Sequence, residues 1–225
     1  MISAVIGAMN SEINKMPLYQ IIQVDSSTRI LLWEITESYE QLREEVQLKE
    51  KSALRVSGMK SQLHRRGFLS VRKLLQESGY TDFDLHYDKF GKPYFEDGKH
   101  ISISHSHEFA GIIISDRIVG IDLELRRDKI ALIAEKFLND TELACLNPSD
   151  PDYIRKLTVL WGVKEVIFKI RNEPGISFKD HIKSAHFEMN ELQTTAHLDM
   201  EHICKSFPIY FQEVGNFTLV YASED

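Results

Sequence analysis

The first third of the chain alternates short apolar segments with turn-forming residues, a pattern that predicts strands. The segments are residues 3–9 (SAVIGAM), 19–24 (YQIIQV) and 29–35 (RILLWEI). After them, apolar residues at helical spacing predict two helices, over 37–57 and about 60–77. We therefore expect this part of the chain to pack helices against a small sheet.

The rest of the chain repeats this mixture. A loop rich in Gly and Pro at 90–100 leads to a predicted hairpin and a third strand, at 101–105, 110–115 and 119–124. Strongly helical patterns cover 129–138 and 153–170, and strand-like segments return at 181–189, 207–213 and 216–223. The pattern predicts an α+β fold made of two similar halves, 1–116 and 117–225, each with helices packed on a small, mostly antiparallel sheet. We expect the halves to be related by a pseudo-twofold axis.

Composition narrows the class of protein. The chain has 43% hydrophobic and 27% charged residues, which is typical of a globular protein. No apolar run approaches the ~20 residues of a membrane helix, and the start MISAVIGAMNSE lacks the features of a secretory signal, so we expect no membrane association. The only cysteines, Cys145 and Cys204, lack metal-type spacing and favour a cytoplasmic location.

Charge is unevenly distributed along the chain. The net charge of -7 argues against nucleic acid as a partner, because nucleic-acid binding depends on neutralising phosphates. Residues 51–76 nevertheless contain no acid and hold seven Lys or Arg residues: Lys51, Arg55, Lys60, Arg65, Arg66, Arg72 and Lys73. Such a stretch is often a solvated helix face, but inside an acidic protein it also suggests a local anion site.

Two carboxylates end the apolar strand GIDLE at 120–124. Asp122 and Glu124 are two residues apart, so they share one face of the strand while Ile121 and Leu123 face the core. A strand end emerging into water would explain the pair, and so would a cation that separates two like charges.

The helix at 153–170 offers a second charged pair. Glu165 and Lys169 are four residues apart and therefore adjacent on the helix. A surface ion pair is one interpretation, but the helix is apolar on nearly all sides and should be largely buried. Asp122, Glu124 and Glu165 could together hold Mg²⁺, which prefers oxygen ligands and often binds substrate phosphates as well.

A phosphate site is the third candidate. Ser104 and His105 end one strand, and Lys92 lies beside a rigid proline turn. Arg65 and Arg66 lie in the basic stretch, although one helical turn cannot direct both the same way. Hydroxyl, imidazole and basic side chains of this kind could surround a phosphate.

Six short motifs together resemble the 4′-phosphopantetheinyl transferase superfamily. In chain order they are HRRGFLSVR (64–72), FGKPYF (90–95), ISISHSH (101–107), GIDLE (120–124), FLNDTEL (137–143) and WGVKEVIFK (161–169). The Asp-x-Glu pair and the chain length resemble the surfactin-synthetase-activator type, whose single chain folds as two similar halves with the active site between them. Residues before about 60 and after about 175 match no such motif.

The resemblance implies an enzyme that transfers the 4′-phosphopantetheine group of coenzyme A to a serine of an acyl or peptidyl carrier protein, releasing adenosine 3′,5′-bisphosphate. It implies Mg²⁺, or alternatively Mn²⁺, bound by Asp122, Glu124 and Glu165. By the same analogy Glu165 is the base, Lys169 stabilises the leaving phosphate, and Glu142 is a further catalytic candidate.

Coenzyme A would contact Ser104, His105, Lys92 and either Arg65 or Arg66. A monomer is expected by the same analogy. Carrier proteins are usually acidic, so recognition by this acidic chain would depend on a local basic or apolar patch. The alternatives are a Mg-dependent pyrophosphohydrolase and a non-catalytic homologue that binds coenzyme A or a carrier protein.

Overall fold

The structure is a computed structural model in which residues 18–224 are described. The strand predicted at 3–9 lies outside these residues. In the first half, the strands are β1 (Leu18–Gln23), β2 (Arg29–Glu34), β3 (His86–Tyr87), β4 (Pro93–Tyr94), β5 (His100–Ser106) and β6 (Phe109–Ser115), and the helices are α1 (Tyr39–Glu45), α2 (Glu50–Gly58) and α3 (Gln62–Glu77). Within the described chain, β1, β2, β6 and β5 form one antiparallel sheet in that order.

The second half forms a separate sheet. Its strands are β7 (Ile118–Leu125), β8 (Ile182–Ser184), β9 (Gln193–Met200), β10 (Ile203–Val214) and β11 (Phe217–Glu224). Its helices are α4 (Ala134–Phe137), α5 (Asp140–Ala144), α6 (Tyr153–Arg171) and α7 (Phe178–His181), with 3₁₀ turns η1 (Asp128–Ile133) and η2 (Met189–Glu191). The sheet order is β7-β11-β10-β9-β8, and its neighbouring strands are antiparallel.

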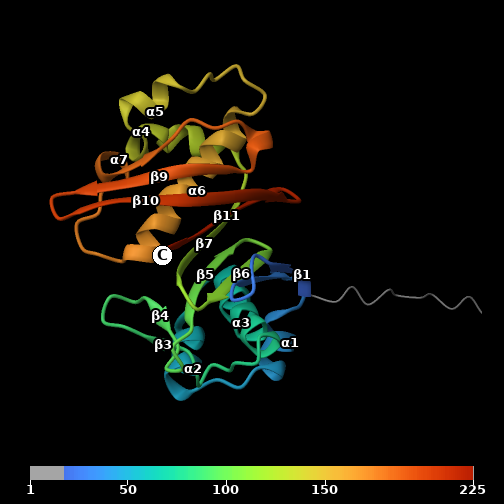
Figure 1. The fold of residues 1–225 in the computed structure, drawn as a ribbon. Helices are drawn as coiled ribbons and strands as arrows, with labels where there is room; N and C mark the ends of the chain where they lie inside the picture. Colours follow the sequence, from blue (N-terminus) through green and yellow to red (C-terminus); the bar gives the residue numbers. More distant parts are fainter. Residues whose placement is uncertain (1–17, 225) are drawn as a thin grey trace, which may run out of the picture.

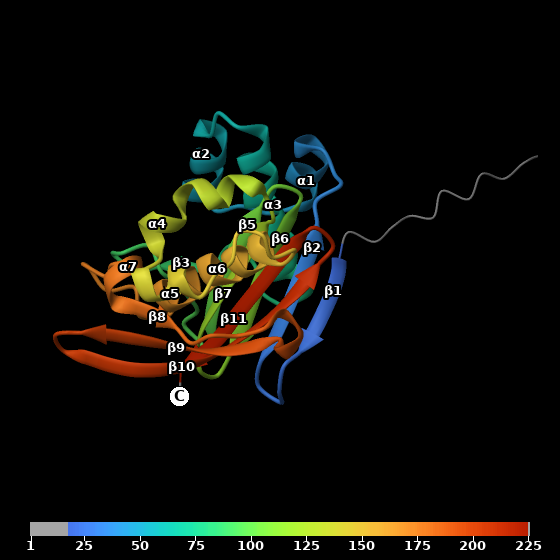
Figure 2. The same ribbon diagram turned by 90° about the horizontal axis from the view of Figure 1, so that it is seen from above.

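The chain passes from the first sheet to the second between β6 and β7. In the view of Figure 1 the second sheet lies above the first, with α6 along one face of the second sheet and α1 to α3 beside the first. Turned by 90°, the molecule shows α4, α5 and α7 on the same side of the second sheet as α6 (Figure 2). The predicted α+β class with antiparallel sheets is therefore confirmed.

β7 connects the two halves. Its residues Ile121 and Leu123 are fully buried and pack in one apolar cluster with Ile30 and Leu32 of β2. Alternation along the strand then directs the side chains between them to the other face. The prediction that Ile121 and Leu123 face the core is confirmed.

Most predicted elements form, with three differences. The helix expected over 37–57 is two helices, α1 and α2, separated by an extended segment. The helical pattern at 129–138 forms a 3₁₀ turn and one short helix, and only 182–184 of the strand expected at 181–189 forms. The sequence interpretation missed β9. No helix in the described part of the chain is long and apolar enough to span a membrane.

Candidate functional site

A cavity of about 510 Å³ opens between the two halves of the molecule. Residues of α2, α3, β5 and the 87–93 loop line it from the first half, and residues of β7 and α6 line it from the second. Acidic and basic side chains that the sequence predicts to be functional both line it. The predicted residues that line it are Asp122, Glu124, Glu165, Lys169, Lys92, Ser104 and His105.

Serine side chains of β5 place β7 at the cavity. The backbone N–H of Ile121 donates to Ser102 Oγ at 3.2 Å, and that of Leu123 donates to Ser104 Oγ at 3.1 Å. Ser104 Oγ in turn donates to Asp122 Oδ1 at 3.1 Å. Backbone N–H groups at the edge of the second sheet thus find hydrogen-bond acceptors in hydroxyl groups of the first sheet. Asp122 is held where the two sheets meet.

Glycines bring α6 directly onto the second sheet. A Cβ atom added at Gly120 would lie 2.6 Å from the carbonyl oxygen of Val166, and one added at Gly162 would lie 2.5 Å from Val220 Cγ2. Only a residue without Cβ permits such a close approach of helix and strand. This contact brings Glu165, one turn after Gly162, close to the acids of β7.

The three carboxylates form an electrostatically strained group. Burial, followed by the charges of Asp122 and Glu124, raises the pKa of Glu165 to about 7, and Lys169 opposes the rise. Burial, followed by the charge of Asp122, also raises the pKa of Glu124, although that carboxylate accepts a hydrogen bond from Ser106 Oγ at 3.0 Å. Half-buried carboxylates with raised pKa values are a common feature of functional sites.

Lys169 partly neutralises the acids. Its Nζ lies 2.8 Å from Asp122 Oδ1 and 2.9 Å from the carbonyl oxygen of Ile121. The other carboxylate oxygen, Asp122 Oδ2, is buried and has no hydrogen-bond partner among the described residues. An unsatisfied buried carboxylate oxygen needs a cation or donor from outside the chain.

These residues fit a hard divalent cation. Asp122, Glu124 and Glu165 offer only oxygen atoms, the donor type that Mg²⁺ prefers, and Asp122 Oδ2 is free to bind. Among residues 18–224, no three His, Cys, Asp or Glu side chains are already close enough together to ligate a metal. A cation would therefore have to draw the three carboxylates inward, and its positive charge would offset their mutual repulsion.

Basic side chains line the other part of the cavity. Lys92 donates from Nζ to the carbonyl oxygen of Ile170 in α6, and burial lowers its pKa. Arg72 is held in a buried ion pair with Asp82, with Nε 2.9 Å from Oδ1. Arg55 of α2 is exposed and also lines the cavity. Lys92 and Arg55 are therefore the cations best placed to meet an anion from solvent.

His105 lies against α3 at a glycine. A Cβ atom at Gly67 would come within 3.0 Å of His105 Nδ1. The absence of a side chain at Gly67 therefore leaves room for the imidazole beside the helix.

The structure does not bring three other predicted residues into this cavity. Arg65 donates to the carbonyl oxygens of Met59 and Ser57, and Arg66 donates to that of Ile35. Glu142 accepts two hydrogen bonds from Lys164 Nζ, at 2.7 and 2.8 Å, in a buried ion pair elsewhere in the second half. These geometries give Arg65, Arg66 and Glu142 contacts that support the fold.

Sequence reasoning missed two cavity residues, Arg55 and Asn172. Arg55 belongs to the acid-free stretch at 51–76, so the sequence did indicate it as a basic candidate. The motif that resembles the family, however, lies on the next helix, α3. Asn172 follows the last residue of α6, and asparagine after a helix is a sequence signal for a left-handed end, not for a binding residue.

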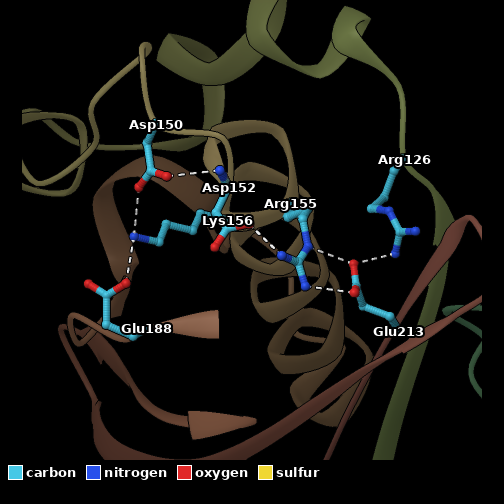
Figure 3. Close-up of polar contacts among 7 residues, drawn as sticks. All are labelled: Arg126, Asp150, Asp152, Arg155, Lys156, Glu188 and Glu213. Carbon is cyan, nitrogen blue, oxygen red and sulfur yellow. Dashed lines mark hydrogen bonds and ion pairs between the residues drawn. The ribbon is translucent and has the colours of Figure 1, made fainter. Parts of the chain in front are cut away.

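An ion-pair network holds the start of α6 (Figure 3). Arg155 Nε and Nη2 lie 2.8 and 2.6 Å from the Glu213 carboxylate of β10, which also lies 2.7 Å from Arg126 Nη1. Lys156 Nζ binds Asp150 at 3.1 Å. Each such partly exposed pair contributes little, but the shared Glu213 links α6 to the residue after β7. The two elements that carry the acids are thus joined at this end.

Comparisons with known proteins agree with the motifs. A family model described as the 4′-phosphopantetheinyl transferase superfamily matches residues 118–214. A 4′-phosphopantetheinyl transferase, gsp, from Aneurinibacillus migulanus is 32% identical over 107 residues, which is 46% of this chain and 45% of that relative. The matched region thus spans less than half of the relative's length. The resemblance inferred from the motifs is confirmed, and the matched segment contains the three acids and Lys169.

Proposed function

We propose that this protein transfers the 4′-phosphopantetheine group of coenzyme A to a serine of a carrier protein and releases adenosine 3′,5′-bisphosphate. The observation that carries the proposal is the convergence of Asp122, Glu124, Glu165 and Lys169 on one cavity, within the segment that resembles this superfamily. Basic residues in the same cavity suit the phosphates of the donor. The pseudo-twofold relation of the halves and a monomeric state are parts of the same proposal.

The donor would enter with its phosphates toward the basic residues. Lys92 of the proline turn and Arg55 of α2 both line the cavity. With Ser104 and His105, these side chains would surround the 3′-phosphate. We propose Arg55 in place of the predicted Arg65 or Arg66, because the guanidinium groups of those residues bind backbone carbonyls outside the cavity.

Asp122, Glu124 and Glu165 would hold Mg²⁺ or Mn²⁺. A bound divalent cation would supply charge neutralisation for the pyrophosphate of the donor. Lys169 would remain close to Asp122 and offer its ammonium group to the leaving phosphate, which stabilises the charge that develops there.

Glu165 would act as the base, directly or through a water. In the metal-free protein burial raises its pKa to about 7, so this carboxylate accepts a proton more readily than an exposed one, as a general base must. The carrier serine would lose its hydroxyl proton to Glu165 while its oxygen bonds to the phosphorus that bears pantetheine. The bond from that phosphorus to the oxygen of the departing nucleotide would break. Positioning of the serine, the phosphorus and the departing nucleotide would supply most of the acceleration.

The carrier protein would approach beside Glu124. An apolar groove of about 300 Å³ adjoins that residue and is shared with Trp161. Arg127 and Lys129 border the groove, and Leu132, in the same 3₁₀ turn as Lys129, is 80% exposed. Such a basic and apolar surface within an acidic chain suits an acidic carrier helix with an apolar side.

The reaction with and without carrier separates the transferase from a pyrophosphohydrolase. Release of adenosine 3′,5′-bisphosphate is followed with coenzyme A and Mg²⁺, once with an apo carrier protein and once without it. A transferase releases the nucleotide only when carrier is present. Release at the same rate without carrier indicates hydrolysis, and no release with several carriers, despite coenzyme A binding, indicates a non-catalytic homologue.

A further inference from the structure

The last helical turn of α6 ends at Asn172 in a left-handed conformation, with φ 48° and ψ 35°. Its backbone N–H donates to the carbonyl oxygen of Phe168 at 2.7 Å, which fixes the backbone at this point. Asparagine tolerates this conformation better than most residues other than glycine. The turn places Asn172 in the wall of the catalytic cavity, three residues after Lys169.

The amide group of Asn172 is not used by the fold. Its Nδ2 atom is buried and has no hydrogen-bond partner among the described residues. Left-handed helix ends need only the backbone, and glycine would meet that requirement without burying an amide. A buried donor with no partner in a cavity wall is therefore best explained by a ligand atom that accepts from it.

The loop that contacts this end of α6 contributes aromatic side chains to the cavity wall. Lys92 of the loop donates to the carbonyl oxygen of Ile170, two residues before Asn172, so loop and helix end lie together. Tyr87 and Phe90 belong to the same loop region, line the cavity and are 37% and 54% exposed. Flat apolar faces near an amide suit a nucleobase, which stacks with one surface and hydrogen-bonds with its edge.

We infer that Asn172 binds the adenine base of the donor and sets the preference for that base. The inference rests on the proposed function, since it takes coenzyme A as the donor. The amide can donate from Nδ2 to a ring nitrogen of adenine and accept at Oδ1 from the exocyclic amino group, the paired contact that asparagine makes with adenine elsewhere. Asn172 is then a specificity-determining residue beside the catalytic Lys169.

The test compares two variants and two donors. Asn172→Gly removes the amide and keeps a residue suited to positive φ, and Asn172→Asp keeps the shape but loses the donor. Leu192→Gly is the matched control, because Leu192 also has positive φ (55°) and is exposed outside the cavity. The donors are coenzyme A and its hypoxanthine analogue, in which an oxygen replaces the amino group.

Binding is measured by calorimetry and transfer by carrier mass. We expect Asn172→Gly and Asn172→Asp to bind coenzyme A about tenfold more weakly, and Leu192→Gly to bind it as the wild type does. The wild type should prefer coenzyme A to the hypoxanthine analogue about tenfold, and Asn172→Gly should lose most of this preference.

Three results would overturn the inference. One is wild-type affinity in Asn172→Gly, another is a preference for coenzyme A that survives the substitution, and the third is equal weakening toward both donors, which would place the amide on a phosphate or pantetheine oxygen. A wild-type protein that binds coenzyme A with this base preference but transfers nothing to a carrier would leave the inference standing and contradict only the proposed function.

Discussion

The close contact of α6 with the second sheet predicts the effect of Gly162→Ala. The added Cβ would lie 2.5 Å from Val220 Cγ2 and 2.9 Å from Val220 Cβ. Val220 pairs with Asp122 across β11 and β7, and both carbons belong to a stiff β-branched residue. Helix and strand must therefore separate, and the shift falls beside the carboxylate that anchors the site.

The magnitude follows from two opposing effects. Overpacking of a filled core costs about 1–3 kcal/mol, and a 2.5 Å approach to a stiff side chain places this site at the upper end, about 2–3 kcal/mol. Alanine gains roughly 1 kcal/mol over glycine in a helix. We expect a net loss of about 1–2 kcal/mol, which for a chain of this size lowers Tm by about 2–8 °C. Transfer should fall by tenfold or more, because Glu165 moves relative to Asp122 and small misplacements of reacting groups are costly.

The assay is thermal unfolding together with the rate of carrier modification. Gly58→Ala is the matched control: Gly58 ends α2, and an added Cβ there meets nothing within 4 Å. That variant should be as stable as the wild type, or slightly more stable, and fully active. If Gly162→Ala matched Gly58→Ala in Tm and rate, the contact of α6 with the sheet would not be what positions the acids.

Three further predictions concern other parts of the molecule. Asp122→Asn should abolish transfer with little loss of Tm, as measured by carrier mass and circular dichroism; normal transfer would exclude Asp122 as a metal ligand. Glu142→Gln should lower stability by about 3–5 kcal/mol, because it leaves the charge of Lys164 buried without its partner; chemical unfolding measures this, and a loss of rate at unchanged stability would instead restore Glu142 as a catalytic residue. Gly67→Ala should displace His105, because His105 Nδ1 would lie 3.0 Å from the new Cβ. Calorimetry should then show severalfold weaker coenzyme A binding at unchanged Tm. Unaltered binding would remove His105 from the donor site.

Local periodicity was enough to predict the parts of the site that lie on regular elements. The alternation in GIDLE placed Asp122 and Glu124 on one face, and their partners Ile121 and Leu123 are fully buried, as predicted. The apolar surround of Glu165 also predicted its burial, which is the main cause of its raised pKa. Both inferences needed only residues that are within a few positions of one another in the sequence.

Features set by distant residues could not be predicted in this way. The break between α1 and α2 depends on Asp82, whose carboxylate accepts hydrogen bonds from the backbone N–H of Lys49 and from Ser52 Oγ, at 3.0 and 3.1 Å. No local signal near Lys49 indicates that contact. Strand β9 was missed because it buries only Ala196 and Leu198 among polar residues, too weak a pattern to recognise before its neighbours are known.

The arginines illustrate the limit of a motif. The resemblance predicts that either Arg65 or Arg66 contacts the donor, because both lie on the helix that resembles the family pattern, but helix rotation decides which way a side chain points. In the structure both donate to backbone carbonyls, while Arg55, one helix earlier, lines the cavity. The basic stretch at 51–76 therefore predicted which part of the chain supplies basic side chains to the cavity, but not which residue does so.

The most direct measurement is the intact mass of an apo carrier protein after incubation with this protein, coenzyme A and Mg²⁺. We predict a gain of one phosphopantetheine group, lost when a chelator removes the metal and lost again in Glu165→Gln. An unchanged carrier mass with the wild-type protein across acyl and peptidyl carriers would contradict the transferase. A gain that persists with the chelator and in Glu165→Gln would contradict the assignment of the acids.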